Sequence, residues 1–241
     1  MREYYENNLY SIEKIGILYN STQMIDMLLN DRHFKIPFNS ITVKKGELVV
    51  SKNEQSEFVY FIRKGIVALK HENYIFDFLK PNDFVGLYEL SEKENSIFDI
   101  VAVKETELVR FKKADILWKV LSYQEGLFYY LHNMNKILIK SIEKQSILLM
   151  FTEKKIIVSL INLLERFGNA TEEGYSLPKE FTNKLISEYT KCHLTTMFTI
   201  FKDLQSSRAI VSTGKPYVYN IDRLKQLEKS LNFQTKKGVR S

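Results

Sequence analysis

Hydroxyl, imidazole and ammonium side chains concentrate in one short stretch of the C-terminal half. The residues that we expect to face outward there are Lys191, His193, Thr195, Thr196, Thr199 and Lys202. An apolar stripe recurs at helical spacing in the same stretch, and we expect it to be buried: Leu194, Met197, Phe198, Phe201 and Leu204. Polar side chains of these types bond phosphates and base edges, so the stretch predicts a nucleic-acid contact. His193 has two interpretations, a phosphate contact or a helix cap.

A second short helix and a β-hairpin are predicted around this stretch. A polar loop over 169–175 precedes Ser176 to Pro178, which can cap and start a helix that carries Leu177, Phe181 and Leu185 on one face. Beyond the threonine-rich helix, residues 210–211 and 217–219 predict the hairpin strands, with Lys215 at the turn as a further phosphate contact. A closing helix is predicted over 222–231, with Asp222 as its N-cap. This order is the outline of a winged helix-turn-helix.

Upstream, residues 113–151 contain no proline and only one glycine, and their apolar period is helical. Steps of four and three residues connect Leu127, Leu131, Met134, Leu138, Ser141, Gln145 and Leu148, as in a coiled coil. A second stripe carries Phe128, Ile142 and Leu149, so we expect the helix to pack on two partners. The polar Ser141 and Gln145 favour a dimer interface over a dry interior; the alternative is a long core helix of one domain. Another amphipathic helix is predicted over 156–167.

Between Ile41 and Phe111 the sequence consists of short apolar runs separated by turn residues. The runs contain β-branched and aromatic residues and are about ten residues apart, which indicates an antiparallel β-roll. Its aromatic side chains are expected to be mostly core, as is Trp118 on the helix that follows. A small organic ligand would be sought at Phe76, Phe78, Tyr88 and Tyr130.

Charge divides the chain into two unlike parts. The sequence has 35 Lys and Arg residues against 29 Asp and Glu, a formal net charge of +6. Residues 1–112 have a net charge of −2 and residues 113–241 a net charge of +8. A basic C-terminal half indicates a polyanionic partner. The basic run Lys236 to Arg240 is more simply a solvated tail than a phosphate contact.

Several motifs in this order resemble the Crp/Fnr superfamily of bacterial transcription regulators. The stretch 58–67, FVYFIRKGIV, is similar to the family's strand–turn–strand YxIxxGxV, and 83–86, DFVG, resembles the turn GDFxG with Asn82 in place of the first glycine. Residues 201–210 resemble the end of the recognition helix and the entry to the wing. The region around His193 and residues 220–225 is closest to the PrfA-like branch. The resemblance implies a homodimer that binds double-stranded DNA and senses a signal through the β-roll. It also implies a regulator that contacts RNA polymerase and more often activates transcription than represses it.

Departures from the family patterns narrow this expectation. Leu87 and Tyr88 stand where cyclic-nucleotide members carry Gly-Glu, and Ser96-Ile97-Phe98 stand where they carry the phosphate-binding Arg. We therefore expect that the roll has lost the residues that hold a cyclic phosphate, because a buried anion needs a cationic partner. The recognition helix lacks the family's guanine-reading Arg, with Thr199 in its place, which predicts an A·T-rich site.

Other chemistry has little support in the sequence. The single Cys192 excludes an internal disulfide and a cysteine-ligated cluster; it is a small apolar filler or, alternatively, a redox sensor. Of the four histidines only His71 falls inside the strand region, so no metal site and no cofactor are expected. No apolar run is long enough for a membrane span, and residues 1–10 do not resemble a signal peptide, so the chain is expected to be cytoplasmic and to have no membrane partner.

Together these patterns predict an α+β protein of three parts. These are an N-terminal β-roll sensor over 1–112 like a cyclic-nucleotide-binding jelly roll, a linker and dimerisation helix over 113–151, and a winged helix-turn-helix over 152–241. The expected function is non-enzymatic regulation of transcription through DNA, with an unidentified small-molecule effector. The alternative is a small-molecule-binding sensory protein that acts through protein–protein contacts.

Overall fold

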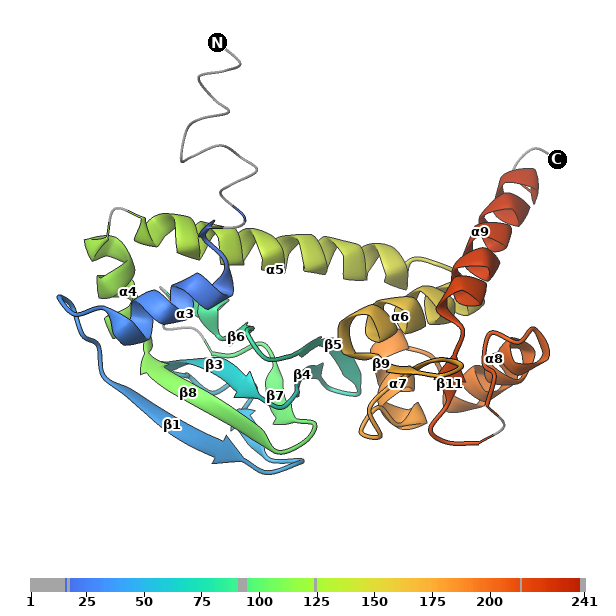
Figure 1. The fold of residues 1–241 in the computed structure, drawn as a ribbon, viewed down its shortest axis with the longest axis horizontal. Coiled ribbons are helices and arrows are strands. Elements are labelled where there is room, and N and C mark those ends of the chain that lie inside the picture. The colour runs from blue at the N-terminus through green and yellow to red at the C-terminus, as the bar shows by residue number, and fades with distance from the viewer. Residues whose placement is uncertain (1–15, 17, 91–94, 124, 213, 239–241) are drawn as a thin grey trace, which may run out of the picture. The chain divides into compact units, whose positions relative to one another are not determined.

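The protein is described here by a computed structural model that covers residues 16, 18–90, 95–123, 125–212 and 214–238. The segment 1–10 and Arg240 lie outside these residues, as do the side chains of the basic run at 236–238. The chain divides into two compact units (Figure 1). Unit 1 contains Met1–Glu72 and Phe76–Ile142, and unit 2 contains Asn73–Ile75 and Glu143–Ser241.

Two four-stranded sheets form the β-roll, which confirms the predicted antiparallel β-architecture. The first has the order β1 (Phe38–Val43), β8 (Thr106–Lys112), β3 (Phe58–Lys64) and β6 (Phe84–Val85). The second has the order β2 (Leu48–Val50), β7 (Asp99–Ala102), β4 (Val67–His71) and β5 (Tyr74–Leu79). Register in the first sheet pairs Tyr60 with Arg110 and Phe61 with Val109. Neighbouring residues of β8 therefore face opposite sides of the sheet.

Each side of the first sheet has its own apolar cluster. Inside the roll, Tyr60, Ile62 and Leu108 pack with residues of the second sheet such as Val67 and Ile100. On the other side, the remaining side chains of the same strands pack with helices: Val59, Phe61, Val109 and Phe111 contact Met24, Leu28, Ile116 and Val120. Strand alternation thus lets one sheet bury both faces, one against β-strands and one against helices.

Two tight turns of the roll need a left-handed backbone. Gly65, between β3 and β4, has φ +109°, and a Cβ there would lie only 2.6 Å from the Cα of Thr106. Asn82 has φ 71° in the turn before β6, where the resembling family motif has glycine. Asparagine is one of the few other residues that tolerate this conformation, so the substitution preserves the turn. A short 3₁₀ helix, η1 (Leu87–Glu89), follows the turn at Gly86.

A buried lysine connects helix α3 (Ser21–Asn30) to helix α4 (Lys113–Ser122). Helix α3 was not predicted from the sequence. The side chain of Lys119 is fully buried, and its Nζ lies 3.3 Å from Oδ2 of Asp31, just beyond α3. The Nζ also donates to the carbonyl oxygens of Leu28 and Phe34. These partners compensate the removal of the ammonium group from water.

The region predicted as a linker and a dimerisation helix forms two helices, α4 and α5 (Gly126–Leu148), and the predicted dimerisation helix corresponds to α5. Trp118, predicted as core, is 66% exposed, because α4 turns Ile116, Lys119 and Val120 inward instead. The second stripe of α5 is only partly packed within this chain. Phe128 stacks on the buried Tyr19, with 5.3 Å between the ring centroids, whereas Ile142 and Leu149 are exposed. The inward face of α5 carries other residues, including Tyr129, Tyr130 and the buried Asn133, which accepts a hydrogen bond from Ser21 at 2.6 Å.

Unit 2 contains the helices and the sheet of the C-terminal part. Its elements are α6 (Thr152–Phe167), β9 (Asn169–Thr171), β10 (Gly174–Ser176), α7 (Asn183–Thr190), α8 (Leu194–Ser206), β11 (Val218–Tyr219) and α9 (Ile221–Gly238). The three strands form one sheet with β10 in the centre. Apolar side chains of α6 such as Ile157, Leu160 and Leu163 are fully buried, and this helix contacts α7 and α9.

Three local predictions for unit 2 require correction. The loop predicted over 169–175 forms the β9–β10 hairpin, since Gly174 and Tyr175 pair with Thr171 and Ala170. Residues 176–178 do not start a helix; α7 starts at Asn183, and its N-cap Thr182 accepts a hydrogen bond from the N–H of Leu185. The cap of α9 is Asn220, whose side chain bonds the N–H of Arg223, rather than Asp222.

Candidate nucleic-acid interface and β-roll pocket

Helices α7 and α8 form a helix–turn–helix with a three-residue turn, Lys191–His193. Lys191 ends α7 in the left-handed conformation (φ 50°), and its N–H donates to the carbonyl of Ser187. His193 occupies the N-cap position of α8, but its side chain makes no capping hydrogen bond. The interpretation of His193 as a capping side chain is therefore wrong, and its ring is exposed. A short turn of this kind leaves the second helix with one face free for a ligand.

The buried stripe of α8 differs from the predicted one. Met197, Phe201 and Leu204 are buried as predicted, and Ile200 completes the stripe. Leu194 and Phe198, predicted to be buried, are 39% and 45% exposed. At 100° per residue, Ile200 rather than Phe198 lies on the side of the other three, so the predicted stripe is rotated around the helix relative to the observed one.

All seven side chains predicted to contact DNA are exposed. They are Lys191, His193, Thr195, Thr196, Thr199, Lys202 and Lys215. Thr195, Thr199 and Lys202 lie on the α8 face opposite the buried stripe, since they are spaced by four and three residues. Thr199 donates its hydroxyl proton to the carbonyl of Thr195, at 3.2 Å. The hydroxyl oxygen can still accept a hydrogen bond, and the helix thereby fixes its position.

Helix α7 is held by a lysine that sequence reasoning missed. The Nζ of Lys144, near the end of α5, donates to the carbonyl oxygen of Tyr189 at 2.6 Å, and this side chain is buried. It also lies over the Tyr189 ring. Lys144 follows Lys140 by four residues on an amphipathic helix, where a lysine is ordinarily solvated. The sequence therefore carries no signal for this contact. Nearby Cys192 is half-buried, and burial raises the pKa of its thiol, which disfavours the reactive thiolate.

The predicted dimer seam lies on the open side of α5. Leu127, Leu131 and Leu138 are 51%, 48% and 56% exposed, and Gln145 is exposed as well. Met134, Ser141 and Leu148 are half-buried. Contiguous apolar side chains on one helix face are rarely left in water, so this face has the character of an interaction surface.

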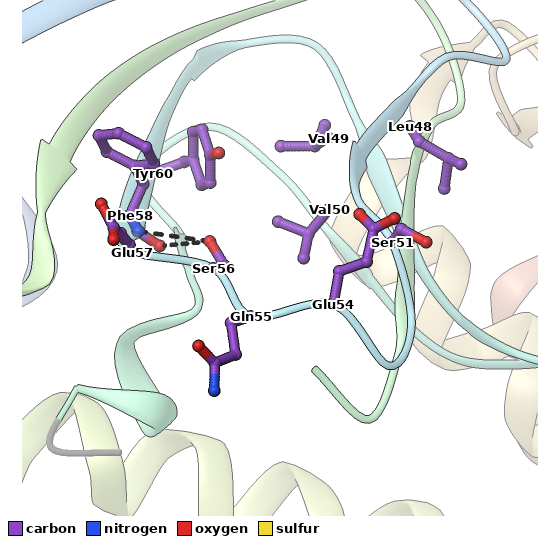
Figure 2. A pocket seen from close by; sticks show the side chains of 10 residues that line it. All are labelled: Leu48, Val49, Val50, Ser51, Glu54, Gln55, Ser56, Glu57, Phe58 and Tyr60. Carbon is purple, nitrogen blue, oxygen red and sulfur yellow. Dashed lines mark hydrogen bonds between the residues drawn. The ribbon is translucent and has the colours of Figure 1, made fainter. Parts of the chain in front are cut away.

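A pocket of about 660 Å³ opens into the roll between β2, β3 and the loop that connects them (Figure 2). Its lining combines apolar and polar side chains: Leu48, Val49, Val50, Ser51, Glu54, Gln55, Ser56, Glu57, Phe58 and Tyr60. The residues predicted as a ligand site do not line it. Phe76 packs in the cluster inside the roll, whereas Tyr130 packs in the cluster beside the helices.

An arginine borders this pocket and was not among the predicted site residues. Arg110 faces the interior of the roll, two residues after the buried Leu108, and its guanidinium lies 4.4 Å from the Phe58 ring centroid. Its Nε is buried without a hydrogen-bond partner among the described residues. Burial raises the pKa of the Tyr60 hydroxyl, and the positive charge of Arg110 only partly offsets this effect. The inward register of Arg110 on its strand was the available signal, because alternating residues share a face.

The turn that resembles the family motif is tied to α5 by an ion pair. Oδ1 of Asp83 lies 2.9 Å from Nζ of Lys136 and 3.9 Å from Nζ of Lys140. Burial would raise the pKa of Asp83, but the ammonium groups of Lys140 and Lys136 outweigh it and hold the pKa below its ordinary value. Asp83 also accepts a hydrogen bond from the N–H of Lys80, which fixes the turn itself.

Metal binding and membrane insertion each require specific features of the described residues. No group of three or more His, Cys, Asp or Glu side chains is placed there to hold a metal ion. None of the helices in that part of the chain is long and apolar enough to cross a membrane.

Comparison with known proteins agrees with this geometry. Residues 40–123 match the cyclic nucleotide-binding domain family. About four fifths of the chain also shares its fold with solved structures. FixK2 from Bradyrhizobium japonicum is similar with a TM-score of 0.68 and 17% identity over 80% of this chain and 98% of that one. A cyclic nucleotide-binding domain containing protein from Listeria monocytogenes gives 0.67 and 17%, over 83% and 97%.

A third similar structure is TTHA1359 from Thermus thermophilus, described as a transcriptional regulator of the CRP/FNR family. Its TM-score is 0.65 at 16% identity, over 79% of this chain and 98% of that one. No relative among curated proteins matches the chain. At these identities the likeness establishes the fold, so the cyclic nucleotide-binding-like roll and the helices after it are shared architecture.

Proposed function

We propose that this chain is a homodimeric, non-enzymatic transcriptional regulator that binds double-stranded DNA in a sequence-specific way. The observation that carries the proposal is the outward face of α8, where hydroxyl and ammonium groups lie together on the second helix of a helix–turn–helix. Such a helix enters the major groove in proteins of this architecture. The net charge of +8 over 113–241 supports a polyanionic partner.

The proposed DNA contacts divide by chemistry. Lys191, Lys202 and Lys215 neutralise phosphates, and His193 adds a further phosphate contact. Thr195, Thr196 and Thr199 contact base edges or phosphates. Without a guanine-reading arginine on α8, the site is A·T-rich. The resemblance to the PrfA-like branch, together with activation through RNA polymerase, belongs to the same proposal.

Pairing of two chains through α5 is the second part. The exposed Leu127, Leu131 and Leu138 support it, because burying them against a second copy removes a large apolar area from water. The rest of the proposed interface is Met134, Ser141, Gln145 and Leu148. Two copies would then present their α8 helices to major grooves one DNA turn apart.

The third part concerns the signal. We propose that the roll has lost the residues that hold a cyclic phosphate and takes another small molecule in the pocket of Figure 2, beside Phe58 and Tyr60. The unpartnered Nε of Arg110 favours a ligand with a carboxylate or phosphate. A site at Phe76, Phe78, Tyr88 and Tyr130 stays a prediction. The alternative, a sensory protein that acts through protein contacts, shares this pocket but needs no DNA.

Selection from a random double-stranded DNA library, followed by fluorescence anisotropy of the selected site, tests the proposal. We expect an enriched A·T-rich sequence with a two-fold repeat. Lys202→Glu should weaken binding at least tenfold, whereas Lys45→Glu, the same charge change at an exposed position of the roll, should not. No enrichment, or equal effects of the two variants, would favour the alternative. A thermal-shift screen of nucleotides, thiols and short peptides, repeated with Arg110→Met, tests the pocket.

A further inference from the structure

Two large apolar side chains of α8 are exposed and lie outside its buried stripe. Leu194 and Phe198 are four residues apart and therefore adjacent on the helix surface, in its first two turns. The core of unit 2 is complete without them, because Met197, Ile200 and Phe201 supply the buried stripe. Because both are exposed and adjacent, they form a small contiguous apolar patch, and such patches mark interaction sites.

The surroundings of the pair indicate what covers it. Phe198 lies between the exposed Thr195, three residues before it, and the exposed Lys202, four residues after it. Lys191 and His193 precede the pair, and no acidic residue occurs from 191 to 202. A neutral apolar centre with a basic surround complements a polyanion that itself displays apolar groups. It does not complement a basic or purely aliphatic protein surface as well.

We infer that Leu194 and Phe198 contact the 5-methyl groups of thymines in the major groove and so determine base specificity. The methyl of thymine is the one apolar group on a base edge in that groove. This inference rests on the proposed function and deepens it: phosphate contacts from the lysines position α8, and the apolar pair then distinguishes thymine from cytosine, which presents an amino group and no methyl. Leu194 and Phe198, which were predicted to be buried, would thus recognise thymine because they are exposed.

Replacement of thymine by deoxyuridine tests this directly, because it removes only the methyl. With the selected site, we expect each contacted thymine-to-deoxyuridine change to weaken wild-type binding about fourfold, the effect of one buried methyl. At the thymine that Phe198 contacts, Phe198→Ala should bind the thymine and deoxyuridine sites equally, and Phe198→Leu should keep part of the difference. Tyr175→Ala, an exposed aromatic on β10, should keep all of it.

The outcomes separate the two levels of the proposal. No binding to any DNA would overturn the proposed function, whereas tight binding that ignores deoxyuridine at every position would overturn this inference alone. Circular dichroism of each variant confirms folding, and Phe198→Leu keeps the test decisive should Phe198→Ala unfold. If Phe198→Ala instead changes the oligomeric state by light scattering and leaves the thymine effect intact, the pair belongs to a contact between chains and the inference is wrong.

Discussion

The carboxylate of Asp83 lies 2.9 Å from the ammonium group of Lys136, and this contact joins the turn before β6 to the long helix α5. The carboxylate is almost fully buried, and a second lysine, Lys140, lies 3.9 Å away. The turn itself is braced by the N–H of Lys80 and by the left-handed Asn82. Any displacement of this turn therefore alters a charged contact on the helix that we propose pairs two chains.

A double-mutant cycle over Asp83→Asn and Lys136→Met measures this contact. We expect a coupling free energy of about 1 kcal/mol by urea unfolding, since one partner is buried while the lysine keeps part of its hydration. Lys64 and Glu107, 3.5 Å apart and both well exposed, give the matched control with a coupling near zero. Equal coupling in the two pairs would show that the burial of Asp83 adds nothing.

Acid should weaken the contact between α3 and α4. Hydrogen bonds from the Tyr123 hydroxyl and the His33 N–H, together with Lys119, lower the pKa of Asp31 from 3.8 to about 2. A lowered native pKa stabilises the fold fully above about pH 4, and this stabilisation is lost as the pH falls toward 2. In urea unfolding between pH 5 and pH 2, Asp31→Asn should have a flatter profile than wild type. Asp26→Asn, on the exposed side of α3, should keep the wild-type slope.

Removing both charges of the buried pair should cost less than removing one. Asp31→Asn leaves the ammonium of Lys119 in the interior without its anionic partner, whereas Lys119→Met combined with Asp31→Asn leaves no buried charge. We expect a higher Tm for the double variant than for Asp31→Asn alone, by differential scanning calorimetry. A lower Tm for the double variant would mean that the bonds of Lys119 to the carbonyls of Leu28 and Phe34 outweigh its charge.

The strands of the roll could be predicted because their cause is local. Runs such as 58–64 and 67–71 are bounded by turns, and Gly65 needs a backbone that few residues adopt. The buried Lys119 could not be predicted in the same way. Its environment comes from segments up to about ninety residues away in the chain, so in the sequence this lysine is indistinguishable from a solvated one.

The candidate site shows the same limit at smaller scale. The polar face of α8 follows from the helical period, and its predicted members are all exposed. Leu194 and Phe198 were assigned to the core because apolar type and approximate spacing favoured it. The angle of 100° per residue instead places Ile200, and not Phe198, on the side of Met197, Phe201 and Leu204. The break between α4 and α5 had one visible signal, Gly126.

Charge placed within the exposed face of α5 should prevent pairing. Leu131→Glu or Leu138→Glu should give a monomer by light scattering at micromolar concentration, because burying a carboxylate in an apolar seam costs several kcal/mol. Ile97→Glu makes the same change at an exposed apolar position of the roll and should leave the mass unchanged. A dimeric Leu138→Glu protein would place the interface elsewhere.

Salt dependence reports the phosphate contacts individually. Lys202→Ala should lower the slope of log K against log salt concentration by about 1 and weaken binding to all sequences alike. Lys45→Ala on the roll should leave the slope unchanged. The comparison is made by anisotropy titration at several salt concentrations on one selected site. A Lys202→Ala slope equal to that of wild type would remove this lysine from the phosphate contacts.

The open leucine face of α5 also has a genetic consequence. Pairing through α5 would not depend on whether α8 can bind DNA, because the pairing surface and the DNA-binding surface belong to different helices. A subunit with a defective α8 and an intact α5 would therefore capture normal subunits in mixed dimers. At equal expression, only about one dimer in four would have two competent DNA-binding helices. Loss-of-function alleles in α8 should accordingly be dominant, whereas those that break α5 should be recessive.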